Sequence, residues 1–576
     1  MPIASGEAHK KNGDGPDFAA LILVVAAAVA ARSWLLWSTP LVPGMNGGYY
    51  LVQARALLEH GALGIPDLPL TFLLQAAFAK LVQLTTGRSL ETSILLAVRL
   101  CDAILPTLVA IPVFLLGRNW CVRTGRSVWP AAVAAALAVL GMPALSMVGD
   151  FEKNSLGLAW LAGLIVALHA WMTQRTCGRA AAVLVLLGLC GLTHIGVFGA
   201  ALLLTALTWA ADLALLRGKE GLRTLRHIGA VAAAGAAVVA LVAGVVLWKF
   251  DPARIQRLTR ALSHPIVFVQ TGGHAGDKNF HAFPPPGDTS DQLRPPPGAQ
   301  PRRADRGHMG PPGQGMLPQG VPTGLFFLVA VGALALPFRR RFGLPLADRA
   351  TTIGCAVTVV LLTGPWMQDD VMMRLRLIAM IPAAFAAVFV MVHLPGRWSA
   401  SLCATAVLAL TAATSIPLLS RGGHPTISAA AFGELRALTA QVTQPNRTLV
   451  VARHGLEWWS AWTLHTHIAQ SRAVLASDWS KYDTVLFIQE KGTRRHGGER
   501  PDRKPMDRRG PPPGFGGPQG GPPMMEAEIP SDAEILHDGT YFRLARVRKP
   551  VEALTPPGGK PQPKRFQAPF MEIMAP

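Results

Sequence analysis

Charged residues are scarce in this chain of 576 residues. Asp, Glu, Lys and Arg make up only 15% of it, whereas half of the residues are hydrophobic and the mean hydropathy is +0.33. This composition excludes an ordinary soluble protein and is typical of proteins that cross a membrane several times. The hydrophobic runs are long, rich in Ala, Leu and Val, and interrupted by Gly and Pro, which spanning helices tolerate.

Cysteine is scarce as well. The six cysteines lie in or beside hydrophobic segments, at positions 101, 121, 177, 190, 355 and 403, and no pair has the spacing of metal ligands. Neither a disulfide scaffold nor a zinc site is therefore expected. The N-terminus also lacks a small-residue cleavage site before its first hydrophobic run, which predicts an uncleaved first span.

The net charge of +20 is distributed rather than gathered into one patch. Much of it comes from short Arg and Lys clusters at the ends of hydrophobic runs, where they set membrane orientation, and the rest lies in Pro/Gly-rich segments. A nucleic-acid partner is therefore not predicted. Membrane lipids are the partners that this distribution favours.

The positions of the basic clusters predict the topology. Lys10 and Lys11 precede the first span and place the N-terminus in the cytoplasm. Alternation from there puts every short basic cluster inside if the run 69–86 does not span, which gives about eleven spans. The predicted fold class is an α-helical multi-pass membrane protein with a small C-terminal α/β domain on the outer side. We expect it in the cell (inner or plasma) membrane.

The predicted domain organisation follows from shifts in composition. We expect a cytoplasmic segment (1–17), a transmembrane domain (18–422), an outer α/β domain (423–548) and a tail (549–576). The transmembrane domain includes a first outer loop (39–68), in which YYLVQARALLEHG predicts a short interfacial helix that ends at Gly61, and a long outer loop (249–322). The Pro/Gly/Arg-rich stretches 271–322 and 491–527 are expected to be disordered, because such sequences bury little apolar surface. In the outer domain, short β-rich runs and a hairpin around Asp538-Gly539 predict a sheet.

Polar side chains gather at the predicted outer face. A transporter usually keeps its polar residues near the middle of the bilayer, so this asymmetry favours an enzyme that meets a lipid-linked substrate at the membrane edge. The clusters are the first loop (Asn46, Tyr49, Tyr50, Gln53 and Arg55), the stretch after the third span (Asp150, Glu152 and Lys153), Thr193-His194, and the start of a late span (Asp369, Asp370, Arg374 and Arg376).

Several of these residues have both a possible chemical role and a structural alternative. Asp150 and Glu152, spaced D-x-E, could hold a divalent metal such as Mg²⁺ or Mn²⁺, and an arginine could clamp a phosphate. Arg374 and Arg376 point to different sides of a helix, so at most one faces a site. The alternatives are a solvated, capping loop around Asp150 with a snorkelling Lys153, and a helix-packing role for His194.

Four short stretches resemble the GT-C class of membrane glycosyltransferases, and within it the catalytic subunits of oligosaccharyltransferases. NGGYYLVQARALLEHG is similar to the first-loop motif of that family, SMVGDFEKNSLGLAW to its second acidic motif, MMRLRLIAMIPAAFA to its late span, and EWWSAW to its WWDYG motif. The resemblance implies a polyprenyl phosphate- or pyrophosphate-linked sugar donor used at the outer face to glycosylate a protein or envelope acceptor.

The resemblance also implies roles for individual residues. Asp150 and Glu152 would be catalytic metal ligands, and Arg374 or Arg376 would contact the pyrophosphate. The other residues would bind the substrates: Tyr49, Tyr50, Arg55, Lys153, His194, Trp458 and Trp459. From the residues alone, Trp458 and Trp459 also fit core aromatics of the small domain.

Two departures from the family pattern leave other functions open. Asn46 and Gly47 stand where the family has an acidic residue, and a neutral amide cannot act as a general base. Ser460 stands at the Asp of WWDYG. These departures keep open an inactive protein that binds a lipid carrier or scaffolds a complex. A transporter or flippase is the other alternative, with Asp102 as its intramembrane carboxylate and Arg99 as the expected partner.

Overall fold

The computed structural model describes residues 14–216, 219–250, 320–336, 344–364, 369–470, 478–491 and 529–547. The chain forms two compact units, a helical unit up to Thr426 and a second unit that begins at Ile427. The predicted disordered stretches 271–322 and 491–527 lie almost entirely outside the described residues, as does the tail.

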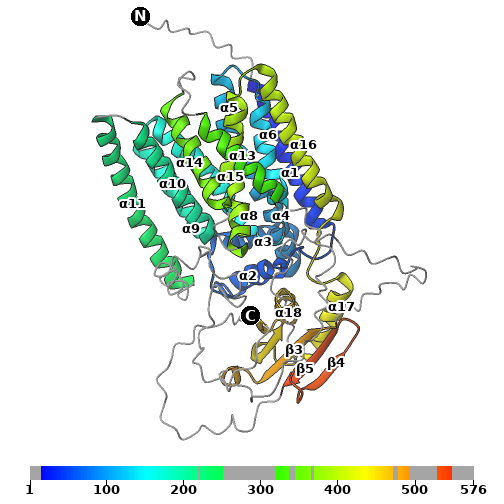
Figure 1. The fold of residues 1–576 in the computed structure, drawn as a ribbon. Helices are drawn as coiled ribbons and strands as arrows, with labels where there is room; N and C mark the ends of the chain where they lie inside the picture. Colours follow the sequence, from blue (N-terminus) through cyan, green and yellow to red (C-terminus); the bar gives the residue numbers. More distant parts are fainter. Residues whose placement is uncertain are drawn as a thin grey trace, which may run out of the picture. The chain divides into compact units, whose positions relative to one another are not determined.

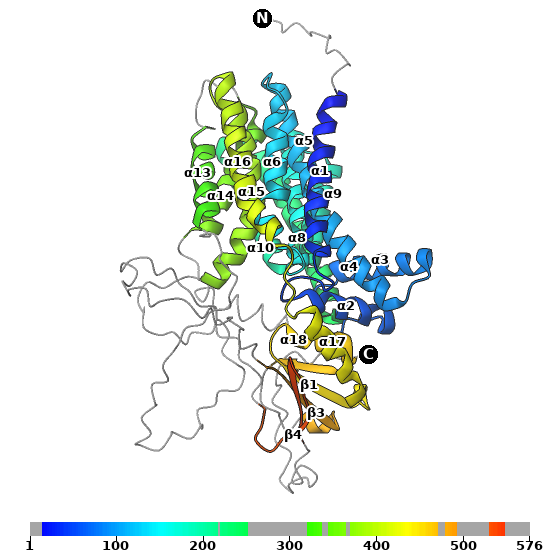
Figure 2. The same ribbon diagram turned by 90° about the vertical axis from the view of Figure 1, so that its right-hand side faces the viewer.

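The helical unit is built from long hydrophobic helices that run side by side (Figures 1 and 2). Its α-helices are α1 (Asp14–Trp37), α2 (Gly47–His60), α3 (Leu70–Thr86), α4 (Leu90–Ile104), α5 (Ala110–Arg123), α6 (Trp129–Leu140), α7 (Met142–Leu145), α8 (Glu152–Thr173), α9 (Cys177–Thr193), α10 (Ile195–Leu215), α11 (Lys219–Phe250), α13 (Gly320–Ala335), α14 (Leu346–Thr363), α15 (Asp369–His393) and α16 (Arg397–Arg421).

Seven helices in the described part are long and apolar enough to cross a membrane, and four shorter apolar helices accompany them. One of the seven, Leu90–Arg123, contains a 3₁₀ turn (Leu105–Val109) between α4 and α5, where Pro106 removes a backbone donor. The protein is thus a helical membrane protein, as the composition predicted.

Two helices depart from the direction of the bundle. α2 and α3 lie across its axis, at the end opposite to the start of α1 (Figure 2). We call this the α2 end. α2 begins after Asn46 and ends at Gly61, whose φ of 68° is the left-handed conformation that glycine adopts readily, as the sequence predicted. The crosswise course of α3 agrees with the interpretation of 69–86 as a non-spanning run.

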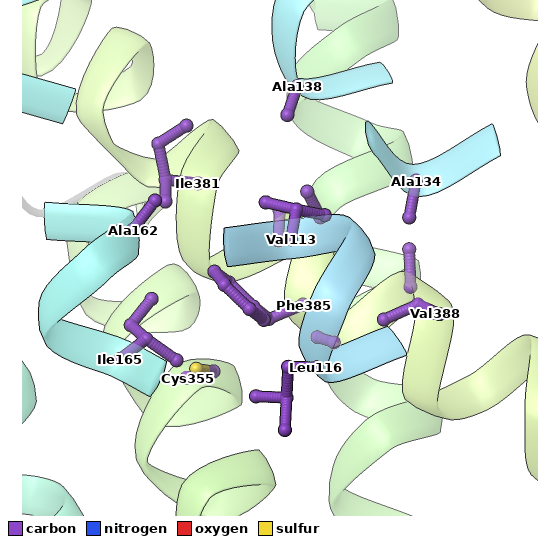
Figure 3. Packing of buried hydrophobic residues seen from close by; sticks show 14 of the residues in the cluster. Val113, Leu116, Ala134, Ala138, Ala162, Ile165, Cys355, Ile381, Phe385 and Val388 are labelled. Atoms are coloured by element: carbon purple, nitrogen blue, oxygen red, sulfur yellow. The ribbon is translucent and has the colours of Figure 1, made fainter. Parts of the chain in front are cut away.

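Small side chains let the spanning helices approach closely. Figure 3 shows Ala134, Ala138 and Ala162 among larger neighbours such as Ile381 and Phe385 in the bundle core. Within a membrane, helices associate through such close packing rather than through the hydrophobic effect. Close packing of small and large apolar side chains therefore holds the helices together in this part of the core.

The second unit carries a five-stranded sheet, with strand order β2-β1-β3-β5-β4. Its strands are β1 (Thr448–Ala452), β2 (His467–Gln470), β3 (Thr484–Glu490), β4 (Glu534–Asp538) and β5 (Phe542–Val547), and its α-helices are α17 (Ala429–Ala437) and α18 (Leu456–Leu464). β1 pairs parallel with β2 and β3, whereas β5 pairs antiparallel with β3 and β4. The predicted small α/β domain and its hairpin at Asp538-Gly539 are confirmed.

Candidate active site at the α2 end of the bundle

Two glycines bring distant loops into backbone contact at the α2 end. Gly44 and Gly149 have φ values of 85° and 75°, which disfavour other residues. A Cβ on Gly44 would lie 2.7 Å from the Cβ of Asp150, and one on Gly149 would lie 2.3 Å from the carbonyl oxygen of Pro43. The loop before α2 and the loop before α8 can therefore lie this close only because both positions are glycine.

A buried ion pair holds the second of these loops. Arg32 of α1 binds the Oδ1 of Asp102 in α4 at 2.5 Å and the carbonyl oxygen of Ala144 at 3.0 Å. The Oδ2 of Asp102 accepts the backbone N–H of Gly149 at 2.8 Å. Asp102 is thus a structural anchor of the loop, which argues against its role in a transport pathway.

The prediction that Arg99 pairs with Asp102 was wrong. Arg99 donates to the carbonyl oxygen of Thr39 at 3.0 Å, and its guanidinium lies 5.8 Å from the ring centroid of Trp37. Arg32 pairs with Asp102 instead because α1 packs against α4.

Asn46 and Asp150 meet directly in the contact between the two loops. The Oδ1 of Asp150 accepts the backbone N–H of Asn46 at 2.9 Å and its side-chain Nδ2 at 2.7 Å. The hydroxyl of Tyr50 lies 3.4 Å from both the carbonyl oxygen of Asp150 and the backbone nitrogen of Lys153. Asp150 is half-buried, so one face of its carboxylate is oriented by the protein while the residue stays accessible.

A second carboxylate, Asp67, completes this cluster. It accepts hydrogen bonds from the hydroxyl of Tyr49 and from the ammonium of Lys153, and its Oδ1 accepts the backbone N–H of Leu68 at 2.7 Å. The Lys153 ammonium also lies 5.2 Å from the ring centroid of Tyr49 and 5.6 Å from that of Phe72. The site therefore holds a cation of its own beside two aromatic rings.

Burial raises the pKa of both Tyr49 and Tyr50 well above the usual range for a phenol. The neighbouring Asp67 raises the pKa of Tyr49 further, and Glu152 does the same at Tyr50. Both hydroxyls therefore stay protonated and serve as hydrogen-bond donors rather than as bases.

Glu152, the first residue of α8, contacts α3 rather than the loop before α2. Its Oε2 accepts the Nε2 of Gln75 in α3, and both side chains line a pocket with Thr71, Cys101 and Asp102. Three buried atoms on this wall make no hydrogen bond within the described part of the chain: Thr71 Oγ1, Gln75 Oε1 and Glu152 Oε1. Two acceptors and one hydroxyl are thus left to meet a water or a hydroxyl-bearing ligand.

The donor set does not fit the metal site that the D-x-E spacing predicted. Among the described residues, no group of three His, Cys, Asp or Glu side chains is placed to hold a metal ion. Asp150 and Glu152 each accept hydrogen bonds from an amide, Asn46 in one case and Gln75 in the other. Metal ligation needs several oxygens turned to one point, and the neighbours here present N–H groups instead.

Other predicted site residues come from α2, the start of α10 and α15. Arg55 is buried in α2, where burial lowers the pKa of its guanidinium while Glu59 and Glu91 counter the shift. His194 accepts the backbone N–H of Val197 and caps α10, which is the structural alternative. Arg374 is exposed and Arg376 is half-buried in α15, and the side chains of Asp369 and Asp370 lie outside the described residues.

Trp458 and Trp459 are buried in α18 of the second unit. The ring of Trp459 lies edge-on to Phe432, with centroids 5.6 Å apart, and the hydroxyl of Ser460 donates to the carbonyl oxygen of Leu456 at 2.9 Å. This packing is that of core aromatics. Their predicted substrate-binding role stays a prediction.

The sequence interpretation missed a second buried network at the other end of the bundle. The Oδ1 of Asp348 in α14 lies 2.9 Å from Trp120 Nε1, 2.8 Å from an Arg123 nitrogen and 2.7 Å from His169 Nε2. We call this the Asp348 network. Its signal in the sequence was an Asp, an Arg and a His at the ends of three separate hydrophobic runs.

The fold has counterparts among solved structures. A sequence comparison matches no protein-family model and no curated protein. The structure is similar to the archaeal oligosaccharyltransferase AglB from Archaeoglobus fulgidus, in complex with an inhibitory peptide and a dolichol-phosphate, over 82% of this chain and 69% of that one (12% identity, TM-score 0.50). ArnT from Cupriavidus metallidurans in the apo state is similar over 92% of this chain and 98% of its own (12% identity, TM-score 0.49). Through its likeness to AglB, this chain has a GT-C-like membrane fold.

Proposed function

We propose that this protein is a membrane glycosyltransferase that uses a polyprenyl phosphate- or pyrophosphate-linked sugar at the outer face and glycosylates a protein or envelope acceptor. The observation that carries the proposal is the cluster of Asn46, Tyr50, Asp67, Asp150 and Lys153 at one end of a hydrophobic bundle with a GT-C-like fold. A lipid carrier requires apolar helices beside a polar headgroup site, and this end of the bundle offers both.

Asp150 is the proposed general base. It is the half-buried carboxylate of the cluster, and its Oδ1 is oriented by Asn46. In the proposed step, the acceptor group loses its proton to Asp150 and bonds to the anomeric carbon. The bond between that carbon and the phosphate oxygen breaks, and the polyprenyl phosphate leaves with the electron pair. Proton transfer to a positioned carboxylate contributes about 10²–10⁴-fold to a rate.

Cationic side chains would stabilise the leaving phosphate. Lys153 is held at the cluster by Asp67, and Arg374 or Arg376 would approach from α15. Tyr49 and Tyr50 would shape the pocket as protonated donors, with Glu152 and Gln75 available to sugar hydroxyls. Arg55, His194, Trp458 and Trp459 remain proposed substrate contacts, and no step is assigned to a metal.

The dolichol-phosphate and inhibitory peptide bound to AglB support a lipid-linked donor and a protein acceptor as the substrate classes. The positive-inside pattern supports a cytoplasmic N-terminus and an outer-face site in the cell membrane. A catalytically inactive carrier-binding protein is the alternative that Asn46 and Ser460 favour.

The test is transfer of a labelled sugar by the purified protein in liposomes, with lipid-linked sugars extracted from the source membranes as donor. Asp150→Asn is expected to lower the rate about 10²–10⁴-fold while the protein stays folded. Asp538→Asn, at an exposed position of the second unit, is the matched control and should retain the rate. Full activity in Asp150→Asn would remove the role of Asp150. Carrier binding without transfer by the wild type would establish the inactive alternative.

A further inference from the structure

Asn46 presents donors where a metal site would need acceptors. Its backbone N–H and its side-chain Nδ2 both point to the same oxygen of Asp150, at 2.9 and 2.7 Å. The amide oxygen cannot take the place of Nδ2, because two acceptor oxygens at 2.7 Å repel each other unless a cation lies between them. The backbone N–H of Asn46 cannot turn, so a donor occupies this oxygen of Asp150 whichever way the side-chain amide lies.

The loops cannot relax away from this contact. Gly44 packs against the backbone and Cβ of Asp150, and Gly149 packs against Pro43, so the two loops are held at backbone distance just before the pair. Asp102, itself bound by Arg32, also holds the loop before α8 through the backbone N–H of Gly149. The separation of residues 46 and 150 is therefore set by the fold rather than by the side chains that occupy these positions.

We propose that Asn46 makes this site independent of divalent metal, by orienting the Asp150 carboxylate with two N–H donors, and that a single change, Asn46→Asp, converts it into a metal site. A carboxylate at position 46 would stand within hydrogen-bond distance of Asp150. Two like charges so close need either a proton or a cation between them. The positive charge of the unmodified site comes from its own side chains, Lys153 beside Asp67 and Arg32 beside Asp102.

The test measures metal retention by the purified full-length protein, without turnover. Wild type, Asn46→Asp and the control Asn119→Asp, which adds the same charge at an exposed position of α5, are incubated with MnCl₂ and desalted. Manganese content and the midpoint of thermal unfolding are then measured. We expect Asn46→Asp to retain roughly one Mn²⁺ per chain and to gain several degrees in Mn²⁺, because ligand binding to the folded state stabilises it. Wild type and Asn119→Asp should retain none and show no shift.

Two results would overturn the proposal. One is stoichiometric Mn²⁺ retention by the wild type, a measurement that does not depend on any variant folding. The other is a folded Asn46→Asp protein that neither retains Mn²⁺ nor changes its unfolding midpoint when Mn²⁺ is added.

A second measurement rests on the proposed function. Chelation with EDTA should leave wild-type transfer unchanged, and Asn46→Asp should transfer sugar only with Mn²⁺ present. A merely structural role of Asn46 predicts no such rescue, and EDTA-sensitive wild-type transfer would contradict the proposal. If no variant transfers sugar under any condition, the glycosyltransferase proposal fails while the metal-retention result still stands.

Discussion

Hydrogen-bonded carboxylates lie at both ends of the bundle, but their partners differ. In the Asp348 network, one carboxylate oxygen is hydrogen-bonded to Trp120 and Arg123 of α5 and to His169 of α8. The Asp348 side chain is 3% exposed. At the α2 end, Asp150 is half-buried, lies in a loop and is held by a neutral amide. The first network joins helices. The second orients the proposed general base and leaves it accessible.

The two ends of the bundle differ in what their carboxylates can do. A buried carboxylate that accepts hydrogen bonds from several helices acts as a cross-link, because removing it leaves those donors unpaired. A half-buried carboxylate can still exchange protons with a ligand. We therefore expect changes at the Asp348 network to affect folding alone, and changes at the α2 end to affect turnover.

The largest loss of stability is expected from Arg32→Met, which leaves Asp102 buried without its cation. Breaking such a pair costs about 3–5 kcal/mol. The control is Arg118→Met, whose partner Asp17 forms a pair in which the two side chains are 24% and 22% exposed. That pair contributes about 0–1 kcal/mol. Thermal unfolding of the purified variants measures both, and equal shifts would contradict the anchoring role of Asp102.

Asp348→Asn is expected to cause the next largest loss of stability. It weakens the charge-assisted hydrogen bond from Arg123, which contributes about 1.5–3 kcal/mol. The protein that remains folded should transfer sugar at the wild-type rate per folded molecule, in contrast to Asp150→Asn. Comparable losses of turnover in the two variants would mean that the ends of the bundle do not differ in function.

Gly149→Ala tests the backbone contact that supports the α2 end. Alanine at a positive φ costs about 1 kcal/mol, and the 2.3 Å approach to Pro43 adds steric strain, for a total of about 1–3 kcal/mol. Gly61→Ala is the matched control, because it has a similar φ of 68° and nothing within 4 Å of the added carbon. Gly149→Ala should lose turnover as well as stability, whereas Gly61→Ala should lose stability only. Wild-type turnover in Gly149→Ala would show that the loop contact does not position Asp150.

The smallest effect is expected from Tyr50→Phe. Its hydroxyl makes two long contacts of 3.4 Å to the backbone of Asp150 and Lys153, so its loss should cost about 0.5–1.5 kcal/mol. Chemical denaturation of the wild type and the variant would measure this difference. A loss larger than that of Arg32→Met would show that Tyr50, rather than Asp102, anchors the loop.

Local features of the fold were predictable from the sequence, whereas side-chain partners were not. Hydrophobic runs indicated the spanning helices, Gly61 the end of α2, and Asp538-Gly539 the hairpin of the second unit. These signals are local in the chain. Asp102 was matched with its neighbour Arg99, but its partner Arg32 lies 70 positions away. Only tertiary packing brings such groups together.

The same limit applies to the candidate site. The sequence identified Asp150 and noted that Asn46 replaces an acidic residue, but it could not place the two in contact across 104 positions. Nor could the D-x-E spacing tell that Glu152 turns to Gln75 on α3 while Asp150 turns to the loop before α2. The glycines that allow this contact have no signature beyond their identity, because φ is decided by the packed loops.

A lipid-linked donor site at Asp150 is tested most directly by photo-crosslinking with a polyprenyl phosphate that carries benzophenone beside its phosphate group. Crosslinked peptides are expected from the α2 end, within residues 42–53, 67–75 and 148–153, and excess unlabelled polyprenyl phosphate should remove them. Crosslinks confined to the helices around Asp348, or spread evenly over the bundle and insensitive to competitor, would contradict a lipid-linked donor site at Asp150.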